Sequence, residues 1–166
     1  NNAMVMLSNL SVPQDTDSKQ QKYALLLRQI RHVVYNEEDM TANLANVAAL
    51  LHHGMDFSWT GFYHARQGEL VLGPFQGPAA VSRIAMDQGV CGTAFNKECT
   101  LVVDDVEQFA GHVPVTDQDR SEIVVCAYRK GEVALLLNVN SNRIKNFTEV
   151  DKQNLEEVMH LLEEVL

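Results

Sequence analysis

Residues 72–94 read LGPFQGPAAVSRIAMDQGVCGTA, and the other predicted elements are arranged around this stretch. Gly tolerates positive φ angles and Pro fixes its own φ, so the Gly-Pro pairs at 73–74 and 77–78 predict a tight turn. Two glycines flank Cys91 at a predicted helix start, where the positive end of the helix dipole would lower the pKa of its thiol. Cys91 is therefore a candidate nucleophile. The alternative is that it is a small buried apolar residue.

The composition argues against two classes of partner. The chain has 166 residues with 22 acidic and 13 basic side chains, which gives a formal net charge of -9. Duplex nucleic acid and anionic membranes are bound through clustered Lys and Arg, so we expect neither as a partner. Apolar runs such as 133–137 are far shorter than the roughly 20 residues that span a bilayer, and no signal peptide opens the sequence. We expect one cytoplasmic domain.

The three cysteines lie at positions 91, 99 and 126, without a Cys-x-x-Cys pair. This spacing predicts neither a zinc site nor a secreted disulfide framework, so we expect reduced thiols and no metal or cofactor. Residues 1–17 contain Pro and many polar side chains, and we interpret them as a disordered arm that starts with a cloning remnant. The expected domain covers residues 18–166.

Hydrophobic periodicity predicts an α+β fold. Helical spacing of apolar residues predicts helices over 18–34, 37–53, 89–97 and 148–166. Runs of β-branched and aromatic residues predict strands over 57–65, 69–72, 80–84, 100–103, 121–128 and 132–141. Little periodicity remains in 106–120, which predicts a long loop of the kind that often carries function. This order of elements indicates an antiparallel sheet with helices packed on its faces.

Alternation along two of the strands selects candidate binding residues. Trp59 and Tyr63 are an even number of positions apart, so they share one face of a strand and form either a binding wall or part of the core. Asn138 and Asn140 share one face of the last strand by the same argument. Two amides on one face of a central strand are costly unless they bind something. These four side chains are therefore candidates for a ligand site.

Five blocks of this sequence, in order, resemble the free methionine-R-sulfoxide reductase family. They span most of the chain from Tyr23 to Leu155, and they read Trp59-Thr60-Gly61-Phe62-Tyr63, Leu72-Gly73-Pro74-Phe75-Gln76-Gly77, Gly89-Val90-Cys91-Gly92-Thr93-Ala94, Asp105-Val106…Phe109…Gly111-His112 and Ser121-Glu122-Ile123-Val124-Val125. The resemblance implies a single GAF domain with a GAF-like α+β fold. It also implies thioredoxin-dependent reduction of free methionine-R-sulfoxide and a tendency to form homodimers.

The resemblance places family cysteines at three positions, and only one of them is a cysteine here. The family nucleophile lies three residues after the Gly-His pair, where this chain has Val115. A second family cysteine, six residues before the Asp-Gln-Gly-Val run, corresponds to Val81, and the third corresponds to Cys91. Val81 and Val115 are therefore lost catalytic positions, because valine cannot attack a sulfoxide.

The resemblance also supplies the binding residues of the pocket. The family glutamate of the Ser-Glu-Ile-Val motif is Glu122 here, whereas two family aspartates are replaced by Asn138 and Asn140. An amide keeps the size of a carboxylate but not its charge, so each lost charge-assisted hydrogen bond to an amino-acid ammonium would cost about 1.5–3 kcal/mol. We expect Trp59 and Tyr63 to converge with these three residues under the loop over 111–120.

Three functional hypotheses follow. The main one is a GAF domain of this family with catalysis lost or impaired and a small polar-ligand pocket retained. A second is an active reductase that works through Cys91, with an external thiol that resolves the oxidised cysteine. A third is a regulatory module that binds a different small molecule. A vestigial pocket, or substitutions introduced by design, would give the same sequence.

Overall fold

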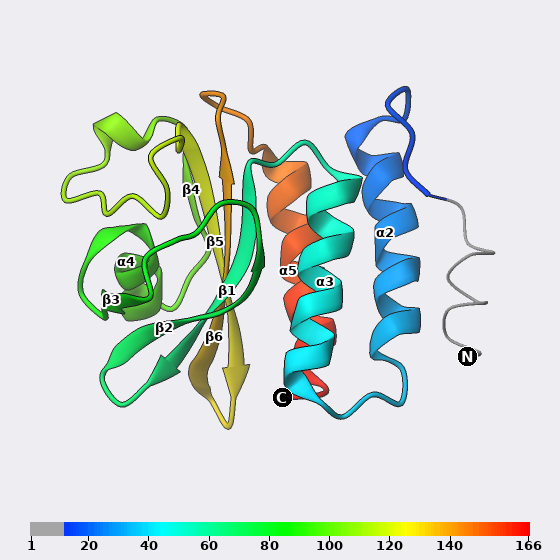
Figure 1. Cartoon of the computed structure of the whole chain (residues 1–166), viewed down its shortest axis with the longest axis horizontal. Helices are drawn as coiled ribbons and strands as arrows, with labels where there is room; N and C mark the ends of the chain where they lie inside the picture. Colours follow the sequence, from blue (N-terminus) through cyan, green and yellow to red (C-terminus); the bar gives the residue numbers. More distant parts are fainter. Residues whose placement is uncertain (1–11) are drawn as a thin grey trace.

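Six strands form one antiparallel sheet in the order β3-β2-β1-β6-β5-β4 (Figure 1). The computed structural model describes residues 12–166, so much of the arm predicted over 1–17 lies outside the described residues. Each neighbouring pair of strands is antiparallel, which confirms the predicted α+β class. The strands are β1 (Trp59–Arg66), β2 (Glu69–Gln76), β3 (Arg83–Ala85), β4 (Leu101–Val103), β5 (Ser121–Arg129) and β6 (Glu132–Ser141).

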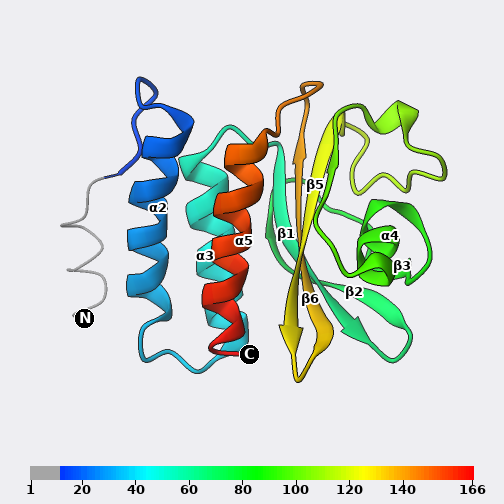
Figure 2. The same cartoon turned by 180° about the vertical axis from the view of Figure 1, so that it is seen from behind.

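In residues 12–166, α-helices lie on both faces of this sheet. α3 (Met40–Gly54) and α5 (Glu149–Glu163) lie against one face, and α2 (Lys19–Val34) packs on them from outside. α4 (Gly89–Lys97) lies on the opposite face with the loops that follow β2 and β4, as the reverse view in Figure 2 also shows. Within residues 12–166, no helix is long and apolar enough to cross a membrane.

Side-chain capping sets where α2 and α3 begin. Ser18 and Gln21 form a reciprocal capping box at the start of α2, so this helix begins where the sequence predicts. The prediction that the next helix begins at residue 37 is wrong by three residues. The Asp39 side chain accepts a hydrogen bond from the backbone N–H of Ala42, which makes Asp39 the N-cap and Met40 the first helical residue.

The central strands divide their side chains between two cores. On β6, Leu135, Leu137 and Val139 face the three-helix layer, whereas Leu136 packs on the other side against the α4 region. Asn138 and Asn140 follow the alternation of Leu136, as the sequence predicts. The helix-side core therefore holds the sheet without using the polar residues of the opposite face.

The tight turn predicted between the Gly-Pro pairs at 73–74 and 77–78 is wrong, because the chain stays in β2 as far as Gln76. The register between β1 and β2 shifts between Gly61 and Tyr63, where Gly73 and Pro74 lie opposite one residue of β1. Such a bulge tolerates a proline that cannot donate a backbone hydrogen bond. The strand turns only at Gly77, whose φ of 124° is a conformation that suits glycine.

The β5–β6 hairpin and the long loop agree with the sequence predictions. Lys130 and Gly131, between the two strands, have φ angles of 53° and 81°, which is the pattern of a tight hairpin turn with positive φ at both central residues. Between β4 and β5 the only regular element in the described chain is a short 3-10 helix, Val106–Gln108. The rest of 106–120 is the predicted loop.

Candidate functional site

The polar residues selected from the sequence lie together on the sheet face opposite the three helices. Trp59 of β1 pairs with Asn140 of β6, and Asn140 pairs in turn with Glu122 of β5. This register places three of the predicted residues in one row across three adjacent strands. Asn138 precedes Asn140 by two residues in β6 and therefore lies on the same face of the sheet. Tyr63 lies on this face too, in the cluster that contains Trp59.

An aromatic wall forms one side of the site. The Trp59 ring stacks on Phe75 with centroids 5.3 Å apart and on Tyr63 at 6.2 Å. This ring lies over Gly61, because a Cβ built at Gly61 would come within 2.5 Å of it. The indole N–H of Trp59 donates to the Pro78 carbonyl at 3.0 Å. Gly61 thus lets the indole lie flat along its own strand.

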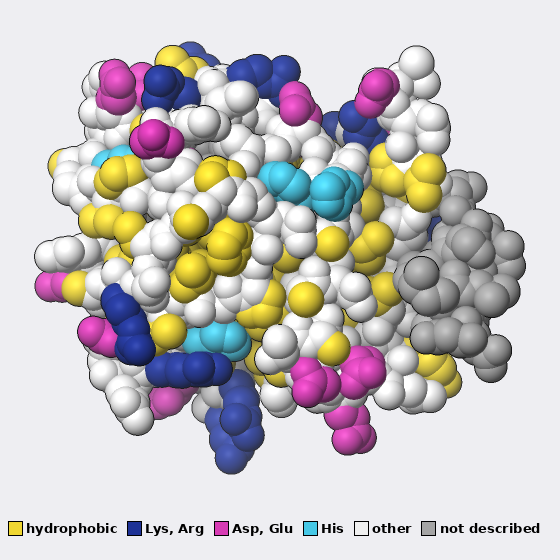
Figure 3. Space-filling view, in the orientation of Figure 1, with side chains coloured by type: hydrophobic (Ala, Val, Ile, Leu, Met, Phe, Trp, Pro, Cys, Tyr) yellow, Lys and Arg dark blue, Asp and Glu magenta, His cyan; other side chains and the backbone are white. Residues whose placement is uncertain are grey.

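The segment that follows β2 closes the site on the outside. The Tyr63 hydroxyl donates to the carbonyl of Val81 at 2.8 Å, and burial raises the pKa of Tyr63 so that the phenol stays protonated. Phe75, Val81 and Met86 are partly buried against the same cluster. In Figure 3 hydrophobic side chains gather over this part of the molecule. The cover is therefore apolar, whereas the floor is polar.

Glu122 lies at the centre of a buried hydrogen-bond network. Its Oε2 accepts from Nδ2 of Asn138 at 2.6 Å, and its Oε1 lies 3.2 Å from Nε2 of His112. Asn140 donates in turn to Oδ1 of Asn138. Burial raises the pKa of Glu122 in spite of these donors, and the hydrogen bond to Glu122 raises the pKa of His112. Three of these side chains are almost fully buried: Glu122, Asn138 and Asn140.

One polar atom of this network is left without a partner. Oδ1 of Asn140 is buried and accepts no hydrogen bond from any residue in the described range 12–166. A buried acceptor without a donor costs about 1–3 kcal/mol, so such atoms are uncommon in folded proteins. This oxygen is an acceptor suited to a ligand that brings an N–H or O–H group into the site.

Cys91 lies at the start of α4, as predicted, but its environment contradicts the predicted reactivity. Nδ2 of Asn138 lies 2.9 Å from its Sγ, and the side chain is buried. Burial raises the pKa of this thiol well above its ordinary value, and the nearby charge of Glu122 raises it further. The expectation of a lowered pKa is wrong because desolvation of a fully buried thiolate outweighs the helix dipole.

The loop before β5 carries Val115 into the same cluster. Backbone N–H groups of Val115 and Thr116 donate to Oδ2 of Asp119 at 2.9 and 3.1 Å, and the Thr116 hydroxyl donates to Oδ1 at 2.8 Å. Val115 is 3% exposed and packs in the cluster that contains Cys91 and Tyr63. The loop also contacts the start of α4, where Val113 would meet a Cβ at Gly89 at 3.0 Å.

Two residues of the site were not selected from the sequence. His112 was used only as part of a motif, and its contact with Glu122 depends on a loop conformation that strand periodicity does not predict. Asp119 organises the loop, and the Thr-x-x-Asp spacing of Thr116 and Asp119 was its available signal, because such pairs bond to nearby backbone groups. Among the described side chains, His, Cys, Asp and Glu form no group of three that would hold a metal ion.

Comparison with known proteins places this site in a family. The profile of the GAF domain matches residues 35–166. GAF domain-containing protein A of Dictyostelium discoideum is 44% identical over 88% of this chain and 93% of its own. Free methionine-R-sulfoxide reductase of Escherichia coli (strain K12) is 37% identical over 90% of this chain and 91% of its own.

A solved structure agrees with these matches. The free methionine-R-sulfoxide reductase of Neisseria meningitidis, in complex with its substrate, superposes with a TM-score of 0.90 at 39% identity, over 94% of this chain and 95% of that one. The chain belongs to the GAF-domain family of free methionine-R-sulfoxide reductases.

The three positions at which the resemblance predicts cysteines, 81, 91 and 115, lie around one site. Cys91 contacts Asn138, Val115 packs in the same cluster, and Val81 accepts from Tyr63 through its carbonyl. The side chains at 81 and 115 are apolar. The network of Glu122, Asn138 and Asn140 occupies the floor between them.

Proposed function

We propose that this GAF domain binds a small polar ligand on the Glu122 face of its sheet and does not turn over free methionine-R-sulfoxide. The observation that carries the proposal is Val115, which stands where the resemblance places the nucleophile. Its side chain is buried in the cluster that also contains Cys91 and Tyr63, and its backbone N–H donates to Asp119. Covalent catalysis needs a nucleophile at that place, and an isopropyl group offers none.

The alternative reaction through Cys91 has weaker support. A lone thiolate can be oxidised to a sulfenic acid and rescued by an external thiol, so the chemistry is feasible in principle. Burial raises the pKa of the Cys91 thiol, however, and Sγ is enclosed next to Asn138. Both features disfavour the thiolate that such a reaction requires.

The amides define what the ligand must offer. Within residues 12–166, Oδ1 of Asn140 is a buried acceptor without a partner, and Glu122 is the acid of the same network. A ligand with an N–H donor would satisfy Asn140 and approach Glu122. Free methionine-R-sulfoxide has such a donor in its ammonium group, but two neutral amides replace two carboxylates. We therefore expect weak binding of this amino acid and tighter binding of a less charged polar ligand.

The assembly and location of the domain are part of the same proposal. We infer a homodimer in the reducing cytoplasm, with thioredoxin as a partner only for a catalytically active variant. The support is the family membership and the three free thiols. Size-exclusion chromatography with light scattering gives the mass of the particle, and a monomer at micromolar concentration would contradict the dimer.

Fluorescence of Trp59 tests the binding half of the proposal directly. Trp59 is the only tryptophan of the chain, and its ring lines the site. Titration with L-methionine, its R-sulfoxide and their N-acetyl amide derivatives should change the emission, with the neutral N-acetyl amides, which keep an N–H donor, bound more tightly than the zwitterions. The variant Asn140→Leu removes the acceptor and should abolish the response. Equal responses from Asn140→Leu and the unmodified chain would refute the assigned site.

A variant in which the predicted catalytic and binding groups are restored tests the second half of the proposal, the loss of catalysis. The combination Val81→Cys, Val115→Cys, Asn138→Asp and Asn140→Asp should give measurable turnover with thioredoxin, its reductase and NADPH, mostly non-additively because nucleophile and binding charges act together. Val115→Cys alone should give little. A matched quadruple variant with Ser in place of both new cysteines should stay silent. A folded but inactive Cys variant would show that loss of these four groups does not explain the missing activity.

A further inference from the structure

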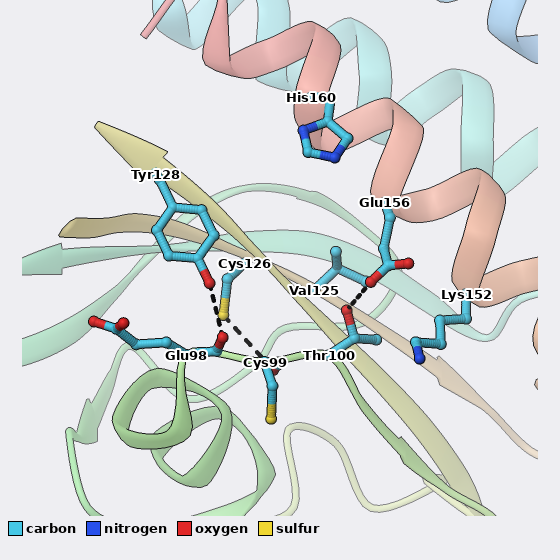
Figure 4. Close-up of a pocket in the computed structure, with 9 residues that line it drawn as sticks. All are labelled: Glu98, Cys99, Thr100, Val125, Cys126, Tyr128, Lys152, Glu156 and His160. Atoms are coloured by element: carbon cyan, nitrogen blue, oxygen red, sulfur yellow. Dashed lines mark hydrogen bonds between the residues drawn. The ribbon is translucent and has the colours of Figure 1, made fainter. Parts of the chain in front are cut away.

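A second group of reactive side chains lies outside the ligand site, where the end of α4 meets β5 and α5. Here a pocket of about 260 Å³ is lined by Cys99 and Cys126 together with Tyr128, Lys152 and Glu156, among others (Figure 4). Cys99 is exposed, whereas Cys126 is 8% exposed. The proposed ligand-binding role uses neither thiol.

The sheet register, extrapolated from β4 to the bend that precedes it, brings these two cysteines close to each other. β4 and β5 pair with Leu101 opposite Val124 and Val102 opposite Ile123. Continuing this antiparallel register two residues beyond the start of β4 places Cys99 opposite Cys126. Directly opposed residues in an antiparallel pair have Cβ atoms about 4.5–5.5 Å apart, whereas a disulfide spans about 3.5–4.5 Å, so a small movement of the segment at Cys99 toward β5 would close the difference.

The contacts of Cys126 agree with this placement. Its Sγ lies 3.8 Å from the carbonyl oxygen of Cys99 and 3.6 Å from that of Ala94. Figure 4 shows the Cys126 sulfur directed at the main chain of Cys99, while the Cys99 sulfur points away from it. A disulfide therefore requires the bend at Cys99, which lies between α4 and β4, to turn this side chain toward Cys126.

We propose that Cys99 and Cys126 are an oxidation site that closes to a reversible cross-strand disulfide when a peroxide reacts with Cys99. The Cys99 sulfur attacks the O–O bond of hydrogen peroxide, which yields a sulfenic acid and one water. The sulfur of Cys126 then attacks the sulfenic sulfur, forms the S–S bond and releases hydroxyl, which leaves with the Cys126 proton as a second water. Two thiols are oxidised and one peroxide is reduced.

The environments of the three thiols assign these roles. Cys99 is open to the pocket and to solvent, so a peroxide reaches it first. Burial raises the pKa of Cys126 to about 12, so it stays a thiol until a sulfenic acid forms beside it. Cys91 lies at the other end of α4, where Asn138 contacts its sulfur. It is not expected to take part.

The disulfide would act on the frame of the ligand site. It would tie the end of α4, whose first turn carries Cys91, to the middle of β5, which carries Glu122. The closed loop from 99 to 126 contains the segment that holds Val115 and Asp119 over the site. Cross-linking this loop lowers the entropy of the unfolded chain, so the oxidised form should melt at a higher temperature.

Peptide mapping of the oxidised full-length chain tests the proposal, because trypsin places each cysteine in its own peptide: 84–97, 98–120 and 121–129. After hydrogen peroxide treatment and blocking of remaining thiols, we expect a linked pair of 98–120 with 121–129 and a chain mass lower by two hydrogens. Dithiothreitol should reverse both changes. Cys91→Ser should keep the link and the rise in melting temperature, and Cys99→Ser should lose both.

Three results would overturn this assignment. One is a linked pair of 84–97 with 121–129. Another is a link between two copies of 98–120, which a reducing-agent-sensitive dimer band would reveal on a gel. The third is oxidation of Cys99 to sulfinic acid, without any link, in a chain whose circular dichroism shows that it is folded.

Discussion

At the scale of single residues, Gly61 is what allows the aromatic wall to form. A side chain there would collide with the indole of Trp59 and with Cβ of Phe75, at 2.5 and 2.4 Å. The Trp-Thr-Gly-Phe-Tyr block therefore has a physical reason for its glycine. The block places an aromatic ring, a gap for that ring and a second aromatic residue on one strand face.

Replacing this glycine should displace the indole. Gly61→Ala should cost about 1–3 kcal/mol of unfolding free energy, because an added methyl in a packed site forces its neighbours to move. It should also shift the emission of Trp59 to longer wavelength. Gly68→Ala is the matched control, since it adds a methyl in open space at φ 82° and should cost roughly 1 kcal/mol without changing the emission. An unchanged spectrum for Gly61→Ala would contradict the packing argument.

The three thiols should react in an order set by exposure. Timed alkylation at neutral pH should label Cys99 first, since Cys91 and Cys126 are buried and their pKa values are raised by burial. This order replaces the one expected from the glycines around Cys91. Peptide mapping at each time point gives the rates, and faster labelling of Cys91 than of Cys99 would show that α4 opens readily in solution.

The His112–Glu122 contact should be visible in a pH titration. The hydrogen bond to Glu122 raises the pKa of His112, while burial lowers the pKa values of His52 and His64. By NMR, His112 should titrate above its ordinary value of about 6.5. Glu122→Gln should move it downward, and the two other histidines provide internal controls that should not move.

The raised pKa of His112 also makes the free energy of unfolding depend on pH. A histidine whose pKa is raised by folding stabilises the fold fully below its unfolded pKa of about 6.5, and this contribution disappears as pH rises through the folded value. The gap in unfolding free energy between the unmodified chain and His112→Gln should therefore narrow from pH 6 toward pH 8. A gap that widens over this range would mean that the contact does not favour the protonated ring.

At the scale of elements, Asp119 fixes the loop that covers the site. Asp119→Ala removes the acceptor of two backbone N–H groups and one hydroxyl, so it should cost about 2–3 kcal/mol and speed hydrogen exchange at Val115 and Thr116. Asp117→Ala, at an exposed position in the same loop, should cost less than about 0.5 kcal/mol. Equal effects of the two substitutions would show that the loop is held by something else.

The sequence predicted an element correctly where both its turn residues and its apolar periodicity mark its ends. The β5–β6 hairpin and α4 agree with their predicted positions, since turn residues and apolar periodicity mark both. β2 runs four residues beyond its predicted end. The prediction stopped at residue 72 because a Gly-Pro pair is a local signal for a turn. The β1–β2 register absorbs that pair as a bulge, and pairing of this kind is a tertiary effect.

The sequence predicted the site residues that lie on strands but not those that lie in the loop before β5. Alternation and the resemblance selected the residues of the strands, and the register brings Trp59, Glu122 and Asn140 into one row. The pKa of Cys91 was not predictable, because it depends on burial under residues from other strands. His112 and Asp119 belong to a loop whose conformation has no periodic signal.

At the scale of the whole molecule, the sheet separates folding from function. Its helix-side face carries an apolar core from α2, α3 and α5, and the opposite face carries the polar network. Val81, Val115, Asn138 and Asn140, the four positions at which the resemblance predicts other residues, lie on or above the second face. The fold can therefore persist while the chemistry of the site changes.

We propose that the chain keeps the fold and the site of its family without the family's catalysis. The most direct measurement is NADPH oxidation by the unmodified protein with thioredoxin, thioredoxin reductase and free methionine-R-sulfoxide, beside a reductase of the same family as positive control. Without sulfur at positions 81 and 115, we predict a rate equal to the protein-free background. Sustained turnover well above that background, abolished by Cys91→Ser, would contradict the account and assign the reaction to Cys91.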